Sequence, residues 1–191
     1  MSLRLVVLLA VLSGCMKAPE PPASAVAADP HAGLDLSPAG QAGPSDEMPR
    51  FSMPAPEGWT AVTPDQSFYL AKWTLPEGGQ ATVSFNVGSP AQNLQRWYGQ
   101  WEVPGQAAAA AAEVSTLEGT PWKNTTVVLR GTLQDTRQLG GGPPREDWML
   151  VGAILEPPQG PVFVKVIAPR SVLEPQLPAL WDAVRSARIE P

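Results

Sequence analysis

Hydrophobic and polar residues divide the chain into three parts. An uninterrupted apolar run covers residues 5–12, whereas residues 19–56 are rich in Pro, Ala, Gly and acidic residues and show no apolar period. Residues 57–191 carry apolar patterns of strand and helix periodicity and hold all seven tryptophans. Because a chain needs apolar surface to bury before it can fold, we expect one globular domain over residues 57–191, preceded by a disordered tether within residues 15–56.

The first half of the domain reads as a β-hairpin. Residues 67–75 and 81–87 alternate between apolar and polar positions, and the intervening Pro76–Gly79 is a turn by composition. In the second strand the alternation predicts that Ala81 and Val83 face the core while Thr82 and Ser84 face outward.

A helix is predicted directly after the hairpin. Ser89, Pro90 and Gln92 form a capping-box signature, with serine at the N-cap and proline at the first helical position. The residues that follow place apolar side chains at helical spacing, so this stripe should lie on the sheet. The stripe consists of Leu94, Trp97, Tyr98 and Trp101.

The second half of the domain is rich in strands. Residues 148–155 and 161–168 are nearly continuous apolar runs, as expected for central strands that are covered on both faces. Further strands are expected at residues 114–117 and 124–132, and the alanine run 107–112 is either a short helix or an ordered loop. Residues 134–147 form a long glycine-rich loop of the kind that is often mobile or functional.

The chain should close with an amphipathic helix over residues 177–187. Ser171 and Glu174 resemble a second capping box, and the apolar stripe consists of Leu177, Leu180, Trp181 and Val184. The order of hairpin, helix, strands and helix predicts an α+β fold with an antiparallel β-sheet covered by helices.

This plan resembles the PsbP-like domains. The resemblance rests on Glu57-Gly58-Trp59 at the entrance to the fold and on the helix that carries the sequence RWYGQW at residues 96–101. It implies an α-β-α sandwich, and it implies a non-catalytic accessory or assembly protein on a membrane face. The family brings no active-site motif to these positions.

The beginning of the chain resembles a bacterial lipoprotein signal. Arg4 precedes the apolar run, which ends in Leu12-Ser13-Gly14-Cys15, a match to the lipobox. The resemblance implies that residues 1–14 are a signal peptide, that Cys15 becomes the first residue, and that it carries a diacylglyceryl group and usually a further acyl chain such as palmitate. An ordinary signal peptide or a buried structural cysteine is the alternative.

Charge and cysteine content limit the partners and the means of stabilisation. The chain has 13 basic and 18 acidic residues, a net charge of −5, and no basic cluster, which argues against nucleic-acid binding. Cys15 is the sole cysteine, so no internal disulfide is expected.

Several kinds of catalysis are excluded by residue content. The sole histidine, His31, lies in the predicted tether, so residues 57–191 lack the histidine and cysteine of hydrolytic triads and of common zinc sites. A soft-metal site built on His31, Met48 and Met53 is conceivable, but a solvated linker is favoured.

Carboxylate chemistry remains as an alternative. Glu146 and Asp147 adjoin the glycine-rich loop, and Asp135, Glu156 and Glu174 are also available. A hydrolase would need two of these carboxylates at a defined separation in a cleft, and a sugar-binding module would combine them with exposed tryptophan. Solvated acids beside turns are the favoured interpretation.

The aromatic cluster of Trp97, Tyr98 and Trp101 has two interpretations. At helical spacing these rings belong in the core, yet one of them could remain exposed as a partner contact.

We therefore expect a lipid-anchored, non-enzymatic envelope protein of binding or accessory type, facing the periplasm or the exterior. It is expected to bind the membrane through Cys15 and to bind an envelope protein, with no catalytic residue, cofactor or metal.

Overall fold

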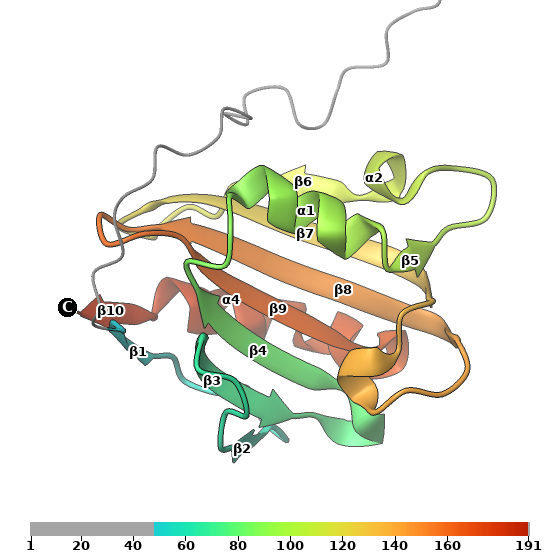
Figure 1. The fold of residues 1–191 in the computed structure, drawn as a ribbon, viewed down its shortest axis with the longest axis horizontal. Coiled ribbons are helices and arrows are strands. Elements are labelled where there is room, and N and C mark those ends of the chain that lie inside the picture. Colours follow the sequence, from blue (N-terminus) through green and yellow to red (C-terminus); the bar gives the residue numbers. More distant parts are fainter. Residues whose placement is uncertain (1–47, 191) are drawn as a thin grey trace, which may run out of the picture.

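The computed structural model describes residues 48–190, which form one large β-sheet with helices on both faces (Figure 1). The predicted signal peptide, Cys15 and His31 lie outside the described residues. The strands are β1 (Arg50–Ser52), β2 (Thr60–Val62), β3 (Tyr69–Thr74), β4 (Gln80–Phe85), β5 (Trp101–Glu102), β6 (Glu113–Ser115), β7 (Lys123–Leu133), β8 (Arg145–Glu156), β9 (Val162–Pro169) and β10 (Arg188–Glu190). The helices are α1 (Pro90–Tyr98), α2 (Ala108–Ala111), α3 (Arg170–Leu173) and α4 (Leu177–Arg185), with single 3-10 turns at η1 (Pro76–Gly78), η2 (Arg137–Leu139) and η3 (Glu174–Gln176).

The main sheet has eight strands, and every pair in it is antiparallel. The strand order is β2-β3-β4-β9-β8-β7-β5, and β6 pairs with β7 as well. The expected α+β fold with a helix-covered antiparallel sheet is therefore confirmed. Strands β8 and β9 lie at the centre, where their apolar runs are covered on both faces, as their composition predicts.

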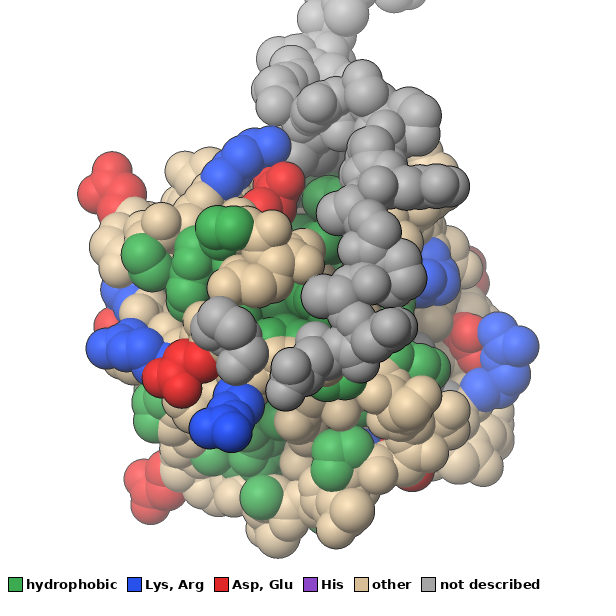
Figure 2. Space-filling view, turned by 60° about the vertical axis from the view of Figure 1, so that its left-hand side comes forward, with side chains coloured by type: hydrophobic (Ala, Val, Ile, Leu, Met, Phe, Trp, Pro, Cys, Tyr) green, Lys and Arg blue, Asp and Glu red, His purple; other side chains and the backbone are tan. Residues whose placement is uncertain are grey.

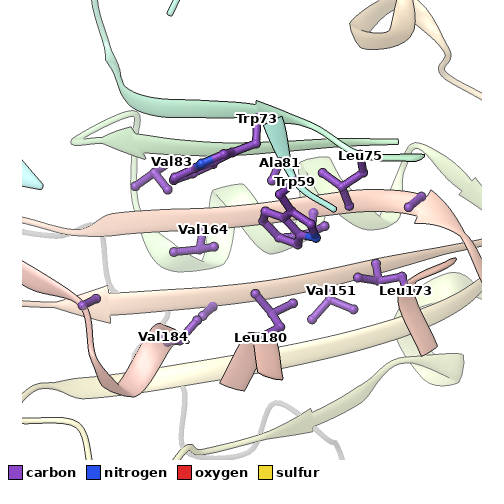
Figure 3. Packing of buried hydrophobic residues seen from close by; sticks show 14 of the residues in the cluster. Trp59, Trp73, Leu75, Ala81, Val83, Val151, Val164, Leu173, Leu180 and Val184 are labelled. Atoms are coloured by element: carbon purple, nitrogen blue, oxygen red, sulfur yellow. The ribbon is translucent and has the colours of Figure 1, made fainter. Parts of the chain in front are cut away.

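One face of the sheet packs against α3 and α4, and we call it the α4 face. Figure 3 shows Trp73, Val83, Val151 and Val164 from four neighbouring strands pointing at the same cluster as Leu180 of α4. The predicted apolar stripe of the closing helix supplies this contact, with Leu180 and Val184 buried and Leu177 and Trp181 partly buried at the edge.

The other face packs against α1, and we call it the α1 face. The capping box forms as predicted: the Ser89 hydroxyl accepts from the Gln92 backbone N–H, and the Gln92 side chain accepts from the Ser89 N–H. Trp97 lies so close above Gly152 of β8 that a Cβ at that glycine would fall 2.4 Å from the indole ring. Glycine at this position therefore lets α1 lie directly over β7 and β8 (Figure 1).

The folded region begins earlier than the predicted boundary at residue 57. Strand β1 lies in the segment expected to be tether, where it pairs with β10, and Phe51 packs against the core of the α4 face. Neither short strand has an alternation long enough to be recognised, and the partners are far apart in sequence. Their pairing depends on the tertiary fold rather than on local pattern.

Smaller differences concern the ends of the predicted elements. Trp101 lies in β5 rather than on the helix, and the alanine run forms the single turn α2. Ser171 lies inside α3, whose N-cap is Pro169 without a side-chain cap, so the second capping box is wrong. Proline has no side-chain acceptor, so the first turn of α3 has no side-chain cap. The predicted loop 134–147 contains η2 and ends where β8 begins at Arg145.

Candidate functional site

The α1 face has an apolar half under α1 and a polar half beyond it. Thr82 and Ser84 of β4 point to this polar half, and Lys165 of β9 lies opposite Thr82 in the register. Thr82 and Ser84 point away from the α4 face, as the alternation predicts. The expectation that these outward-facing side chains are exposed to solvent is wrong. Thr82 is 6% exposed, Ser84 9% and Lys165 6%.

These residues line a hollow of about 350 Å3, which we call the Lys165 pocket. Strand β4 contributes two hydroxyls, β9 the lysine, and α1 contributes Arg96 and the edge of Trp97. The pocket exists because α1 lies over β7 and β8 and leaves β4 uncovered on this face (Figure 1). Its lining consists of Phe68, Tyr69, Thr82, Ser84, Val87, Arg96, Trp97 and Lys165.

Lys165 has a strongly shifted pKa in this pocket. Its ammonium donates a hydrogen bond to Gln100 Oε1 at 2.6 Å, just beyond the end of α1. Burial lowers the pKa of Lys165 from 10.5 to about 7, because removal from water disfavours the charged form. The nearby charge of Arg96 lowers this pKa further, and the carboxylate of Asp135 opposes both effects.

Gln100 connects Lys165 to the segment that follows β7. Its backbone carbonyl accepts from the Gln134 N–H at 2.8 Å, and its side-chain amide lies 3.5 Å from the Asp135 carboxylate. The Arg137 guanidinium beside Asp135 holds the pKa of that carboxyl well below its usual range. A second hollow of about 560 Å3 lies here, and it shares Arg96 with the Lys165 pocket.

Of the five carboxylates that the sequence offered for catalysis, three lie on β8, one follows β7 and one lies in η3. Asp135 pairs with Arg137 beside the second hollow, and Glu156 pairs with Lys123 at 3.2 Å. Glu146 and Asp147 are exposed near the start of β8. Figure 2 likewise shows charged side chains spread over the face in view rather than gathered into one patch of a single sign.

Glu174 belongs to a network that joins the sheet to the helical layer. Arg130 of β7 donates to both of its carboxylate oxygens, and Arg170 donates to one of them at 2.8 Å. The hydrogen bond from Arg130 is the main reason that the pKa of Glu174 falls to about 2. This geometry is typical of a structural ion pair.

The aromatic residues predicted as a possible partner contact are core residues. Trp97, Tyr98 and Trp101 are all buried in the cluster of the α1 face. All three therefore lie in the core, as the first interpretation has it, and the alternative of one exposed ring is not met. Burial also raises the pKa of Tyr98 to about 12.

A metal site has no support among the described residues. Within residues 48–190 no three side chains of the His, Cys, Asp and Glu types gather where they could hold an ion. Met53 packs against the core of the α4 face, whereas Met48 is exposed. His31, the third member of the conceivable metal site, lies outside the described residues.

The sequence contains one signal for the Lys165 pocket that hydrophobic periodicity does not reveal. Lys165 is the single charged residue in the apolar run 161–168. A lysine inside a strand that is covered on both faces must be buried, and buried lysines are uncommon unless paired. Arg96 gave no such signal, because an arginine on the polar side of an amphipathic helix is ordinary.

Among known proteins, similarity is found with solved structures. No protein-family model matches the chain, and no curated protein matches it. The chain is similar to the solution structure of cyanobacterial PsbP (CyanoP) from Synechocystis sp. PCC 6803, with a TM-score of 0.41 and 11% sequence identity. The match covers 81% of this chain and 98% of that one. A similarity at this TM-score carries no conclusion about family or function.

Proposed function

We propose that this chain is a lipid-anchored protein of the bacterial cell envelope that acts by binding rather than by catalysis. The observation that carries the proposal is the sequence Leu12-Ser13-Gly14-Cys15 at the end of a short apolar run. Lipid on Cys15 would hold the folded domain at the membrane, facing the periplasm or the exterior. Two or more acyl chains are needed for this, since a single chain of myristoyl length binds a membrane only marginally.

The folded domain supports a role in binding. Residues 57–191 contain no histidine or cysteine. The carboxylates of Asp135, Glu156 and Glu174 form ion pairs with arginine or lysine. The Lys165 pocket, in contrast, collects cationic and hydroxyl side chains in a hollow of the size that small ligands use. An envelope protein is the partner proposed for the domain as a whole.

Substitution of Cys15 tests the anchoring. The full-length Cys15→Ala chain is expected to lose palmitate labelling and to move from the membrane fraction to the soluble fraction, because it lacks the thiol that accepts the lipid. The control is Ser13→Ala, which keeps a small residue before the cysteine and should remain on the membrane. A Cys15→Ala chain that still fractionates with membranes would overturn the anchoring.

The binding role has its own test. Pull-down of the full-length chain from detergent-solubilised envelope should recover a defined protein, and the same protein should be recovered with the Cys15→Ala chain. Recovery with the acylated chain alone would mean that the lipid, and not the folded domain, makes the contact.

A further inference from the structure

We propose that the Lys165 pocket binds a small organic anion, with the oxyanion at Lys165 and Arg96 and the apolar part of the ligand against Phe68 and Tyr69. The ligand class is a carboxylate or phosphate that carries a ring or a short apolar group. This inference deepens the binding part of the proposed function and does not depend on the lipid anchor.

The charge of the lining points to an anion. Lys165 and Arg96 are both cationic, and none of the eight lining residues is acidic. Two cations near one hollow repel each other, and the charge of Arg96 is one of the causes that lower the pKa of Lys165. An oxyanion between them would relieve this repulsion and accept charge-assisted hydrogen bonds from both side chains.

Hydroxyl groups extend the same polar surface. Thr82 and Ser84 present their side chains from β4, and Tyr69 presents its phenol from β3. Hydroxyls can donate to the remaining oxygens of a carboxylate or phosphate. Burial within the sheet gives Thr82 and Ser84 fixed positions, which reduces the entropy lost when a ligand is bound.

The rim of the pocket is aromatic. Phe68 is 39% exposed, and it is one of two large hydrophobic residues that the described chain leaves in solvent. Its ring packs edge-on against Tyr69, with 4.7 Å between centroids. An exposed aromatic ring beside a polar hollow gains contact area when a ligand brings an apolar group. A bare inorganic ion would leave this surface unused.

The size of the hollow sets the scale of the ligand. A volume of about 350 Å3 lies at the lower end of the range for small-molecule sites. It is too small for a folded segment of another protein. We therefore assign it to a compact ligand and leave protein contacts to other parts of the surface.

Ligand affinity should depend on pH near neutrality. An anion favours the protonated form of Lys165, whose pKa is about 7, so binding should weaken as the pH rises through this value. The other ionisable groups that face this lysine are Arg96 on α1, Asp135 after β7 and Tyr69 on β3. Arginine keeps its charge throughout, while burial raises the pKa of Tyr69 and the Arg137 pair lowers that of Asp135, so neither titrates in this range.

The experiment uses the full chain, purified in a neutral detergent, and calorimetric titration with three probes. Benzoate and phenyl phosphate carry the two anionic groups, and benzamide is the uncharged counterpart of benzoate. At least one anion is expected to bind saturably and at least about tenfold more tightly than benzamide, with affinity that falls as the pH is raised from about 7 to about 9, where both probes keep a nearly constant charge. Comparison of the two anions distinguishes a carboxylate site from a phosphate site.

Two variants locate the binding. Lys165→Met and Arg96→Gln should each weaken the better anion by about tenfold or more, and Lys165→Met should also remove the pH dependence. Lys123→Met is the matched control, because this lysine pairs with Glu156 and lies outside the pocket. Arg96 is exposed, so its variant decides the outcome if circular dichroism shows that Lys165→Met does not fold.

Three results would overturn the proposal: no saturable binding of either anion, neither anion binding more tightly than benzamide, or affinities unchanged in the pocket variants. Failure of the anchoring proposal is a separate result. The Cys15→Ala chain should bind the probes as the unaltered chain does, because the pocket is built from residues 68–165.

Discussion

The two faces of the sheet are built from the same strands but present different side chains. On β4 and β9, the side chains that point to the α4 face are apolar, such as Val83 and Val164, and they meet the buried leucines of α3 and α4. Those that point to the α1 face at the same level are Thr82, Ser84 and Lys165. Both sets are buried, yet only the first set is packed against apolar partners.

Because of this difference, burial does not stabilise the two faces equally. The α4 face gains free energy from removing apolar area from water. The polar half of the α1 face gains little from that source, and it carries the cost of desolvating an ammonium group. Polar groups held out of water in an otherwise apolar sheet are a common mark of a functional site.

The sharpest test of this comparison is a pair of truncations, one on each face. Leu180→Ala should lower the free energy of unfolding by about 3 kcal/mol, because it leaves a cavity in the apolar layer between α4 and the sheet. Ser84→Ala should change it by about 0.5 kcal/mol or less, since the hydroxyl borders a hollow. Urea unfolding of both variants measures the two values, and similar losses would mean that the two faces are equivalent in stability.

Lys165→Met is expected to act in the opposite direction and to stabilise the protein. Replacing a buried ammonium by an apolar side chain of similar length should raise the free energy of unfolding below pH 7 by roughly 1–2 kcal/mol. The gain is limited because Gln100 Oε1 loses its hydrogen-bond donor. Urea unfolding at a series of pH values measures the effect.

The stability of the unaltered chain should change with pH in a direction set by the lowered pKa of Lys165. Between about pH 7 and pH 10.5 the unfolded chain holds the Lys165 proton that the folded chain has lost, so stability should rise with pH across this range. The variant should lack this contribution, and Lys123→Met should retain it. A destabilised Lys165→Met chain that keeps the rise would contradict the assigned cost of burial.

The smallest expected effect concerns the ion pairs at the edge of the α4 face. Glu174→Gln should lower stability at neutral pH by less than about 1 kcal/mol, because Glu174 is 34% exposed and solvent screens its contact with Arg130. Thermal unfolding should show the difference disappearing as the pH falls from 4.5 to about 2, where the folded carboxylate of the unaltered chain becomes protonated. The exposed Glu118→Gln is the control, and a loss as large as that of Leu180→Ala would mean that the pair does more than join two layers.

Much of the architecture was predictable because it depends on local pattern. The capping box at Ser89 fixed the start of α1, and the apolar runs of β8 and β9 identified the central strands. The alternation in β4 gave the direction of each side chain correctly. It gave the exposure of Thr82 and Ser84 wrongly, because alternation reports which face a residue points to and says nothing of what lies above that face.

The site was less predictable for a similar reason. Lys165 was recognisable as a charge in an apolar strand, but its neighbours come from β3, β4 and α1, which are far apart in sequence. The pocket depends on where α1 lies on the sheet, and this depends on the contact between Trp97 and Gly152. No spacing rule links a helical tryptophan to a glycine on a distant strand.

The pairing of β1 with β10 has a consequence for engineering. Arg50 lies opposite Glu190, so the two ends of the folded unit meet at one point of its surface. A short linker between them would make the backbone a closed ring, and new ends could then be opened at the glycine-rich turn of residues 140–142 without cutting a strand of the main sheet. Such a circular permutant would present the Lys165 pocket on a scaffold whose attachment point has moved to the opposite end of β8.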